Sequence, residues 1–148
     1  MSKPNIKNYT SGVAADRSVS KIEQTLVDLG ATNISKQYID GKLAAISFLI
    51  LVNGNTVPFK LPARVDKVRE ALRKSYKRIS TPALRKITEQ ADRTAWKIVS
   101  DWVEIQATLI RLEQAEFLEV FLPYAYKIEQ DQTFFERLKS TNYKALLN

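Results

Sequence analysis

Residues 33–61 read NISKQYIDGKLAAISFLILVNGNTVPFKL, and two turn signals divide this stretch into three strand-like runs. Asp40-Gly41 separates the first run from the apolar run 43–52, and Asn53-Gly54 separates that run from the third. Such dipeptides favour two-residue hairpin turns, in which both central residues take positive φ. Connections this short join antiparallel neighbours, because a parallel crossover needs many more residues. The sequence therefore predicts a three-stranded antiparallel sheet with strands at about 33–39, 43–52 and 56–61.

The third run and the middle run differ in their apolar pattern. In the third run, Val57, Phe59 and Leu61 alternate with Lys60, as in a strand with one buried face. Pro58 has no N–H to donate, so we expect this strand at an edge of the sheet or at a bulge. The middle run is apolar at both odd and even positions, which predicts cover on both faces.

Helical periodicity surrounds the three runs. Before them, residues 19–29 carry apolar side chains at helical spacing, with Ser18 or Ser20 as the candidate cap and Gly30 as the candidate stop residue. After them, the spacing predicts a helix over 64–78. The order α-β-β-β-α, followed by further helices, gives the fold class α+β.

The chain after residue 80 is predicted to be helical, without further strands. Thr81-Pro82 combines a capping hydroxyl with a proline at the first helical position, and it begins a long helix that reaches Leu112. Pro123 ends a short apolar segment. Asp131 is the expected cap of a final short helix.

The aromatic residues are assigned to the core with one exception. Trp96 and Trp102 each belong to an apolar stripe of the long helix, so we expect both to be mostly buried. Tyr9 lies among polar residues and is the aromatic that we expect to be exposed. The core assignment extends to Phe48, Phe59, Phe117, Phe121, Phe134 and Phe135.

We divide the chain into three parts. Residues 1–17 lack hydrophobic periodicity and are interpreted as a flexible arm. Residues 18–79 form the α-β-β-β-α half, and residues 80–148 form a helical half packed on it. A chain of 148 residues is long enough for one core of ordinary size, so both halves are expected to share one compact domain.

Charge is distributed unevenly along the chain. The sequence has 23 Lys and Arg against 16 Asp and Glu, a formal net charge of +7. Residues 60–86 hold ten basic and two acidic side chains, whereas residues 101–136 hold eight acidic and two basic ones. The basic segment favours a polyanionic partner such as DNA or RNA. A solvated helix face, docked on the acidic segment or on a partner, is the alternative interpretation.

The candidate contact residues follow from the apolar side of the helix predicted at 64–78. The residues that must face the core are Val65, Val68, Leu72, Tyr76 and Ile79, which turns the basic side outward. Because no Asn or Gln accompanies the basic residues, we expect phosphate contacts rather than readout of base edges. The candidate nucleic-acid-binding residues are Lys60, Arg64, Lys67, Arg73, Lys74, Lys77, Arg78, Arg85 and Lys86.

Two known architectures offer topological precedents. The double-stranded-RNA-binding domain has the same α-β-β-β-α order, but this sequence lacks a Gly-rich approach to a Lys-rich helix start. Three-stranded sheets that enter DNA grooves are the second precedent. Both analogies concern topology alone, so the choice between DNA and RNA stays open.

The sequence does not predict an enzyme, a metal site or a cofactor. It has no Cys and no His, which excludes disulfides, zinc sites built on thiolate or imidazole, and triads with a His base. The predicted strands hold essentially no carboxylates for a two-metal site. Adjacent Ser and Lys residues, such as Ser75 and Lys74, point about 100° apart on a helix and cannot relay a proton.

The same sequence predicts a protein without a membrane segment. The longest apolar run, 43–52, is far shorter than the roughly 18–20 residues of a membrane span. The polar residues 1–16 do not lead into the apolar core of a signal peptide. We therefore expect a cytoplasmic protein.

Four stretches resemble a group of small proteins encoded by bacteriophages and integrated mobile elements. They are Asp40–Phe48, Val57–Ala63, Ala95–Glu104 and Phe117–Tyr124. That group has no assigned activity, so the resemblance implies a setting in a bacterial host and no catalytic residues.

A phage setting offers two functions for a protein with this charge pattern. We predict a non-catalytic nucleic-acid-binding accessory protein that uses a basic helix face for phosphate contacts. The alternative is a protein-binding inhibitor or regulator of a host factor, in which the acidic residues 101–136 could mimic nucleic acid.

Overall fold

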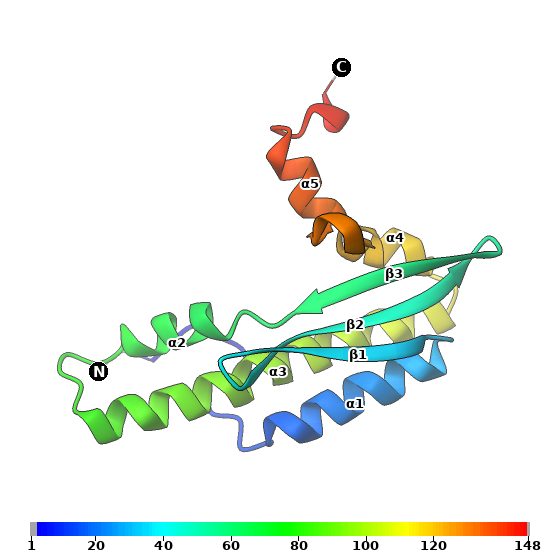
Figure 1. Ribbon diagram of the computed structural model, residues 1–148. Helices are drawn as coiled ribbons and strands as arrows, with labels where there is room; N and C mark the ends of the chain where they lie inside the picture. Colours follow the sequence, from blue (N-terminus) through cyan, green and yellow to red (C-terminus); the bar gives the residue numbers. More distant parts are fainter. Residues whose placement is uncertain (1–2, 148) are drawn as a thin grey trace. The chain divides into compact units, whose positions relative to one another are not determined.

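The computed structural model describes residues 3–147, whose elements up to α3 follow the predicted order (Figure 1). Helix α1 (Ala15–Asp28) precedes the strands β1 (Thr32–Ile39), β2 (Lys42–Val52) and β3 (Asn55–Pro62). The elements after β3 are α2 (Val65–Arg73), α3 (Thr81–Arg111), α4 (Phe117–Phe121), η1 (Leu122–Tyr124), β4 (Tyr126–Lys127), η2 (Ile128–Gln130), β5 (Gln132–Thr133), α5 (Phe134–Ser140) and η3 (Lys144–Leu146). The predicted α+β class, with one helix before a three-stranded antiparallel sheet and a mainly helical half after it, is confirmed.

The described chain divides into two compact units. The helical unit contains the described residues up to Thr25 and Ala63–Ile105. The sheet unit contains Leu26–Pro62 and the described residues from Gln106 onward. The basic segment therefore falls almost entirely in the helical unit, and the strands fall in the sheet unit.

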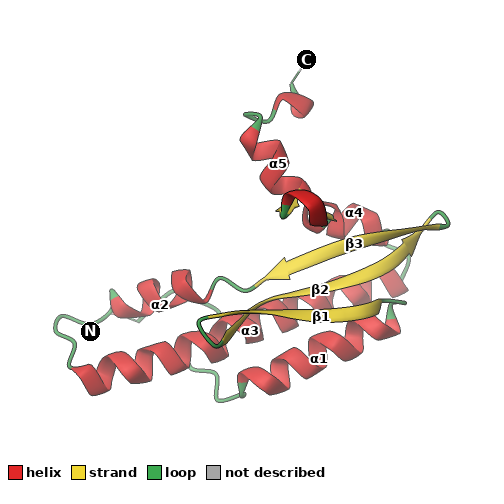
Figure 2. Ribbon diagram, viewed as in Figure 1, coloured by secondary structure: helices red, strands yellow, loops and turns green. Residues whose placement is uncertain are grey.

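The two predicted hairpin turns form as the sequence indicates. Strand β2 pairs antiparallel with β1 and with β3, and the sheet order is β1-β2-β3 (Figure 2). The pairs Ile39–Lys42 and Val52–Asn55 close two-residue turns. Asp40 and Gly41 have φ of 51° and 77°, the left-handed values that such turns require. The edge position predicted for β3 from Pro58 is confirmed.

Aromatic packing on one face of the sheet holds the sheet unit together. Phe48 of β2 and Phe59 of β3 stack with ring centroids 5.5 Å apart. Phe117 stacks on Phe121 of α4, and each of the two meets Phe48 edge-on. The opposite face of β2 is only partly covered, because 70% of Leu51 is exposed. The prediction that other parts of the protein cover both faces of β2 is therefore only partly correct.

Strand β1 forms the other edge of the sheet, and nearly all its residues are exposed. Its ladder with β2 shifts register between Thr32 and Ser35, where Asn33 has a φ of 52°. A second shift lies between Gln37 and Tyr38. Within residues 3–147, no strand pairs with the outer edge of β1.

The end of helix α1 was predicted correctly, whereas its beginning was not. Gly30 takes a φ of 100°, and the N–H groups of Gly30 and Ala31 donate to the carbonyls of Val27 and Leu26. This pair of bonds is a Schellman motif, which satisfies the last carbonyls of the helix. The helix begins at Ala15 rather than at Ser18 or Ser20, because Ser18 is buried within the helix and cannot serve as a cap.

The prediction that no strand follows residue 80 is wrong. The two-residue strands β4 and β5 form a short antiparallel hairpin, with Tyr126 opposite Thr133. Asp131 lies between them with a φ of 48° and does not cap the final helix. Thr133 caps α5 instead, since its hydroxyl accepts from the N–H of Glu136 while Glu136 Oε1 accepts from the N–H of Thr133.

The aromatic assignments hold for both tryptophans and for four phenylalanines. Trp96 of α3 is fully buried, and Trp102 is mostly buried, as expected. The core assignment of Phe134 and Phe135 is wrong, because 38% and 46% of their surfaces are exposed. The four phenylalanines described above form the aromatic cluster of the sheet unit.

Candidate nucleic-acid interface

The helix that carries the first basic residues is shorter than predicted. It ends at Arg73 rather than near Arg78. The N–H and the hydroxyl of Ser75 both donate to the carbonyl of Leu72, at 3.2 and 2.7 Å, and tighten the chain into a turn. A longer helix would also place the like charges Lys74 and Arg78 four residues apart, which is unfavourable.

An apolar cluster beneath α2 fixes which side of the basic segment faces outward. Leu72 of α2 and Ile87 and Ala91 of α3 are buried together. Val65, Val68 and Ile79 pack against this cluster, as the helical spacing predicted. The assignment of Tyr76 to the core is wrong, because 40% of its surface is exposed. The basic side chains between these apolar positions therefore point to solvent, on α2 and on the irregular segment that follows it.

Seven of the nine predicted contact residues are exposed and lack an ion pair within residues 3–147. Their charges consequently remain available to an external anion. We call this group the basic surface; it consists of Arg64, Lys67, Lys74, Lys77, Arg78, Arg85 and Lys86.

Arg73 differs from these seven because it is paired within α2. Its Nη2 and Nε donate to the two carboxylate oxygens of Glu70, at 2.8 and 3.1 Å. The hydrogen bond from Arg73 lowers the pKa of Glu70, and the same bond raises the pKa of Arg73. Arg73 thus offers a phosphate fewer free donors than its neighbours do.

Lys60 belongs to the sheet unit, where its charge is already engaged. Its Nζ lies 3.4 Å from Asp131 Oδ1 and 5.0 Å from the ring centroid of Tyr126. The Tyr126 hydroxyl donates to the same carboxylate, and that bond raises the pKa of Tyr126 to about 12. The bond from Tyr126 and the charge of Lys60 together lower the pKa of Asp131. Lys60 therefore has a structural partner.

The N-terminal arm makes specific contacts with α3. Thr94 Oγ1 donates to the carbonyl of Asn8 at 2.8 Å, and Gln90 Nε2 and Arg93 Nε donate to the carbonyl of Ser11 at 3.0 and 3.2 Å. Tyr9 packs against the apolar cluster of Leu72, Ile87 and Ala91. The expectation that Tyr9 is exposed is therefore wrong.

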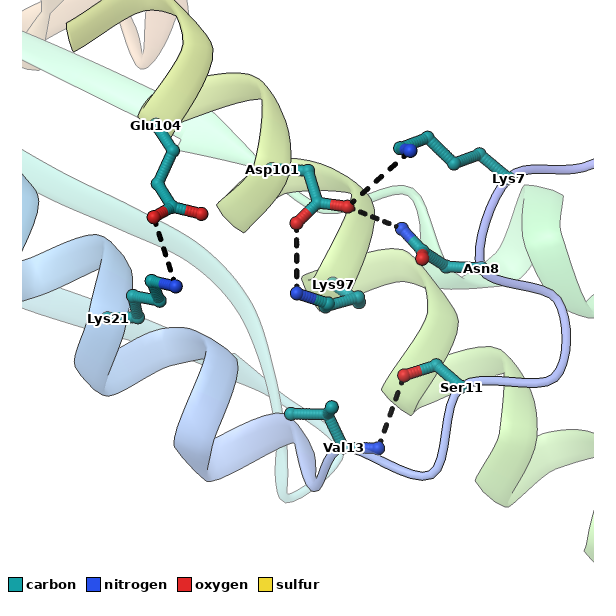
Figure 3. A network of polar contacts seen from close by, with 8 residues as sticks. All are labelled: Lys7, Asn8, Ser11, Val13, Lys21, Lys97, Asp101 and Glu104. Atoms are coloured by element: carbon teal, nitrogen blue, oxygen red, sulfur yellow. Dashed lines mark hydrogen bonds and ion pairs between the residues drawn. The ribbon is translucent and has the colours of Figure 1, made fainter. Parts of the chain in front are cut away.

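Asp101 of α3 is the centre of the polar network that contacts the arm (Figure 3). Its carboxylate accepts from Asn8 Nδ2 and from Lys97 Nζ, both at 2.9 Å, and Lys7 Nζ lies 3.9 Å away. Burial raises the pKa of Asp101, but the bonds from Asn8 and Lys97 and the charges of Lys97 and Lys7 outweigh burial, so the pKa is lowered overall.

We expect Asp101→Asn to reduce the free energy of unfolding at pH 7 by about 1–2 kcal/mol, because charge-assisted hydrogen bonds are lost. A carboxyl with a lowered pKa in the folded state stabilises the fold fully above its unfolded-state pKa of about 3.9. This stabilisation disappears as pH falls below that value, so the parent should lose more stability than the variant between about pH 4 and 2.

Urea denaturation across this pH range measures the difference. Glu104→Gln is the matched control: Glu104 pairs with Lys21 at 3.0 Å, but its side chain is 41% exposed. An exposed pair contributes about 0–1 kcal/mol. Equal losses in the two variants would contradict the role assigned to Asp101.

The sequence did not reveal a cleft that borders the basic surface. Its walls come from the arm, from residues 72–76 and from α3, three segments that only the folded chain brings together. The sequence signal was Ile6 and Tyr9, two large apolar residues among the polar residues 5–12, which both pack against the apolar cluster.

Comparisons with protein-family models, curated proteins and solved structures found no match to this chain. No helix among residues 3–147 has the length and apolar character to cross a membrane. The same residues contain no group of three or more acidic side chains arranged to hold a metal ion. The functional proposals therefore depend on the chemistry of the surfaces described above.

Proposed function

We propose that the protein is a non-catalytic accessory protein that binds nucleic acid through phosphate contacts of the basic surface. The observation that carries this proposal is the exposure of seven cations that have no ion pair among the described residues. Neutralising phosphates with such side chains releases condensed counterions, which favours binding at low salt. Arg73 and Lys60 contribute less, because Glu70 and Asp131 hold their charges.

The chemistry of the basic surface supports binding with little sequence preference. Its members are all Lys or Arg, which contact phosphate readily, and no Asn or Gln accompanies them to read base edges. The likeness to phage and mobile-element proteins favours a role beside replication or recombination in the cytoplasm of a bacterial host. Catalysis forms no part of this proposal.

Fluorescence anisotropy with single- and double-stranded DNA and RNA, over a salt series, tests the proposal. Log affinity should fall linearly with log salt concentration. If all seven cations neutralise phosphates of duplex DNA, the slope approaches about −6, and fewer contacts give a shallower slope. If none of the four nucleic acids binds at the lowest salt concentration, about 50 mM, the proposal is contradicted.

An exposed apolar group in the sheet unit favours a second candidate function, binding to a protein of the host as an inhibitor or regulator. Exposed apolar side chains that gather in one segment are typical of protein-binding surfaces. Capture from a bacterial lysate by the parent, but not by a Phe135→Ser, Leu147→Ser variant, would support this function. Within residues 122–147 the exposed large apolar residues are Leu122, Ile128, Phe134, Phe135, Tyr143, Leu146 and Leu147.

A further inference from the structure

A cleft of about 580 Å³ lies in the helical unit, a volume within the usual range of small-molecule sites. Leu72 and Ile87 give it an apolar base, and the rings of Tyr9 and Tyr76 line it as well. Its remaining lining residues are Lys3, Pro4, Thr10, Ser75, Lys86, Glu89, Gln90 and Arg93.

We infer that this cleft holds an unpaired nucleotide of a single-stranded nucleic acid. The inference rests on the proposed function and adds the form of the ligand, a strand with at least one unstacked base. The basic surface alone would accept single strands and duplexes alike, whereas a base inside a duplex is stacked and paired and cannot enter the cleft.

The aromatic lining supports a base as the occupant. Tyr76 is 40% exposed although it belongs to the apolar spacing of its segment, so its ring is available to a ligand. Tyr9 is fixed by its packing against Leu72 and Ile87. Tyrosine rings beside apolar side chains give flat surfaces on which any base can stack, because every base has a π-face.

The charges around the cleft support a phosphate beside that base. Three cations, Lys3, Lys86 and Arg93, line the cleft against one carboxylate, Glu89. Arg93 uses two of its five N–H donors, for Ser11 and Gln90, and the described contacts leave the others unused. Lys86 is exposed and also belongs to the basic surface. The backbone of a strand could therefore pass from the basic surface to the cleft.

The polar groups of the cleft predict weak discrimination among bases. The side-chain amide of Gln90 donates to Ser11 and Thr94 and accepts from Arg93. The hydroxyl of Ser75 donates to the carbonyl of Leu72. These groups are already engaged within the protein, so stacking and charge should dominate.

Two variants of the full-length protein test the cleft directly. Thr10 lines the cleft and is exposed, so Thr10→Trp should block part of the space without disturbing the core. Tyr76→Ala removes the exposed ring. Each change should weaken binding of a fluorescein-labelled oligothymidylate roughly tenfold, the scale of one stacked base, and leave duplex DNA affinity within about twofold. Tyr38→Ala, which removes an exposed tyrosine from β1, is the control and should change neither affinity.

The outcomes separate this inference from the proposed function. Loss of oligothymidylate affinity in Thr10→Trp, with duplex affinity retained and circular dichroism unchanged, supports the cleft. If the parent binds single strand and duplex equally and neither variant alters binding, the cleft inference fails while the basic surface remains functional. If no nucleic acid binds to the parent, both proposals fail. Should Tyr76→Ala not fold, Thr10→Trp decides the matter alone.

Discussion

Reversal of Lys67, Lys74 and Arg78 to glutamate is expected to abolish nucleic-acid binding and to leave the protein folded. All three side chains are exposed and none is ion-paired among the described residues, so their replacement breaks no ion pair there. Exposed substitutions of this kind usually change stability by less than about 0.5 kcal/mol each. Each lost phosphate contact should reduce the slope of log affinity against log salt by about 1, and the new carboxylates repel the phosphates.

A control with the same total charge change separates local contact from net charge. Lys42, Lys139 and Lys144 are exposed in the sheet unit, and their reversal to glutamate changes the charge by the same amount. This control should retain most of the affinity. Equal loss in both variants would show that overall charge, rather than the basic surface, attracts the nucleic acid. If the variant with Lys67, Lys74 and Arg78 reversed binds as tightly as the parent, the basic surface is solvent-exposed but does not bind nucleic acid.

Phe59→Ala is expected to lower the free energy of unfolding by about 3–5 kcal/mol, as for other large-to-small changes in cores. Phe59 is completely buried, and its ring lies 5.5 Å from that of Phe48 and 5.2 Å from that of Phe117. Removing the ring leaves a cavity among side chains of three segments and takes away both aromatic contacts. Urea denaturation followed by circular dichroism measures the loss.

Phe135→Ala is the matched control for this measurement. The same atoms are removed, but 46% of Phe135 is exposed in the parent, so its truncation should cost less than about 1 kcal/mol. A similar loss in both variants would contradict the assignment of the core to the cluster of Phe48, Phe59, Phe117 and Phe121.

The sheet could be predicted from the sequence because its signals are local. Asp40-Gly41 and Asn53-Gly54 fix two turns by their backbone preferences alone, and the observed positive φ values follow from them. Pro58 identified an edge strand by its missing N–H. Neither inference depends on residues distant in the chain.

Features that depend on competing local bonds or on distant segments could not be predicted in this way. The apolar spacing of α2 continues to Tyr76 and Ile79, but the Ser75 hydroxyl binds a backbone carbonyl and ends the helix at Arg73. Strands β4 and β5 have two residues each, too few to show an alternating pattern.

In the candidate site, too, features set by local spacing could be predicted, whereas features set by contacts between distant residues could not. The outward direction of the basic residues followed from periodicity, which held for Val65, Val68, Leu72 and Ile79 and failed for the exposed Tyr76. The engagement of Lys60 by Asp131 joins residues 71 positions apart, and the contact of Asn8 with Asp101 joins residues 93 positions apart. No spacing rule anticipates such pairs. The cleft depends on contacts between the arm and α3, like that of Asn8 with Asp101.

The irregular ladder of β1 has a consequence for how the protein behaves in concentrated solution. An edge strand with an unbroken row of N–H and C=O groups can act as a template on which further copies add and grow into fibres. In β1 the register shifts twice within eight residues, and Lys36 places a charge between the two shifts. An incoming strand could match only short stretches of this edge, which disfavours growth of a continuous intermolecular sheet.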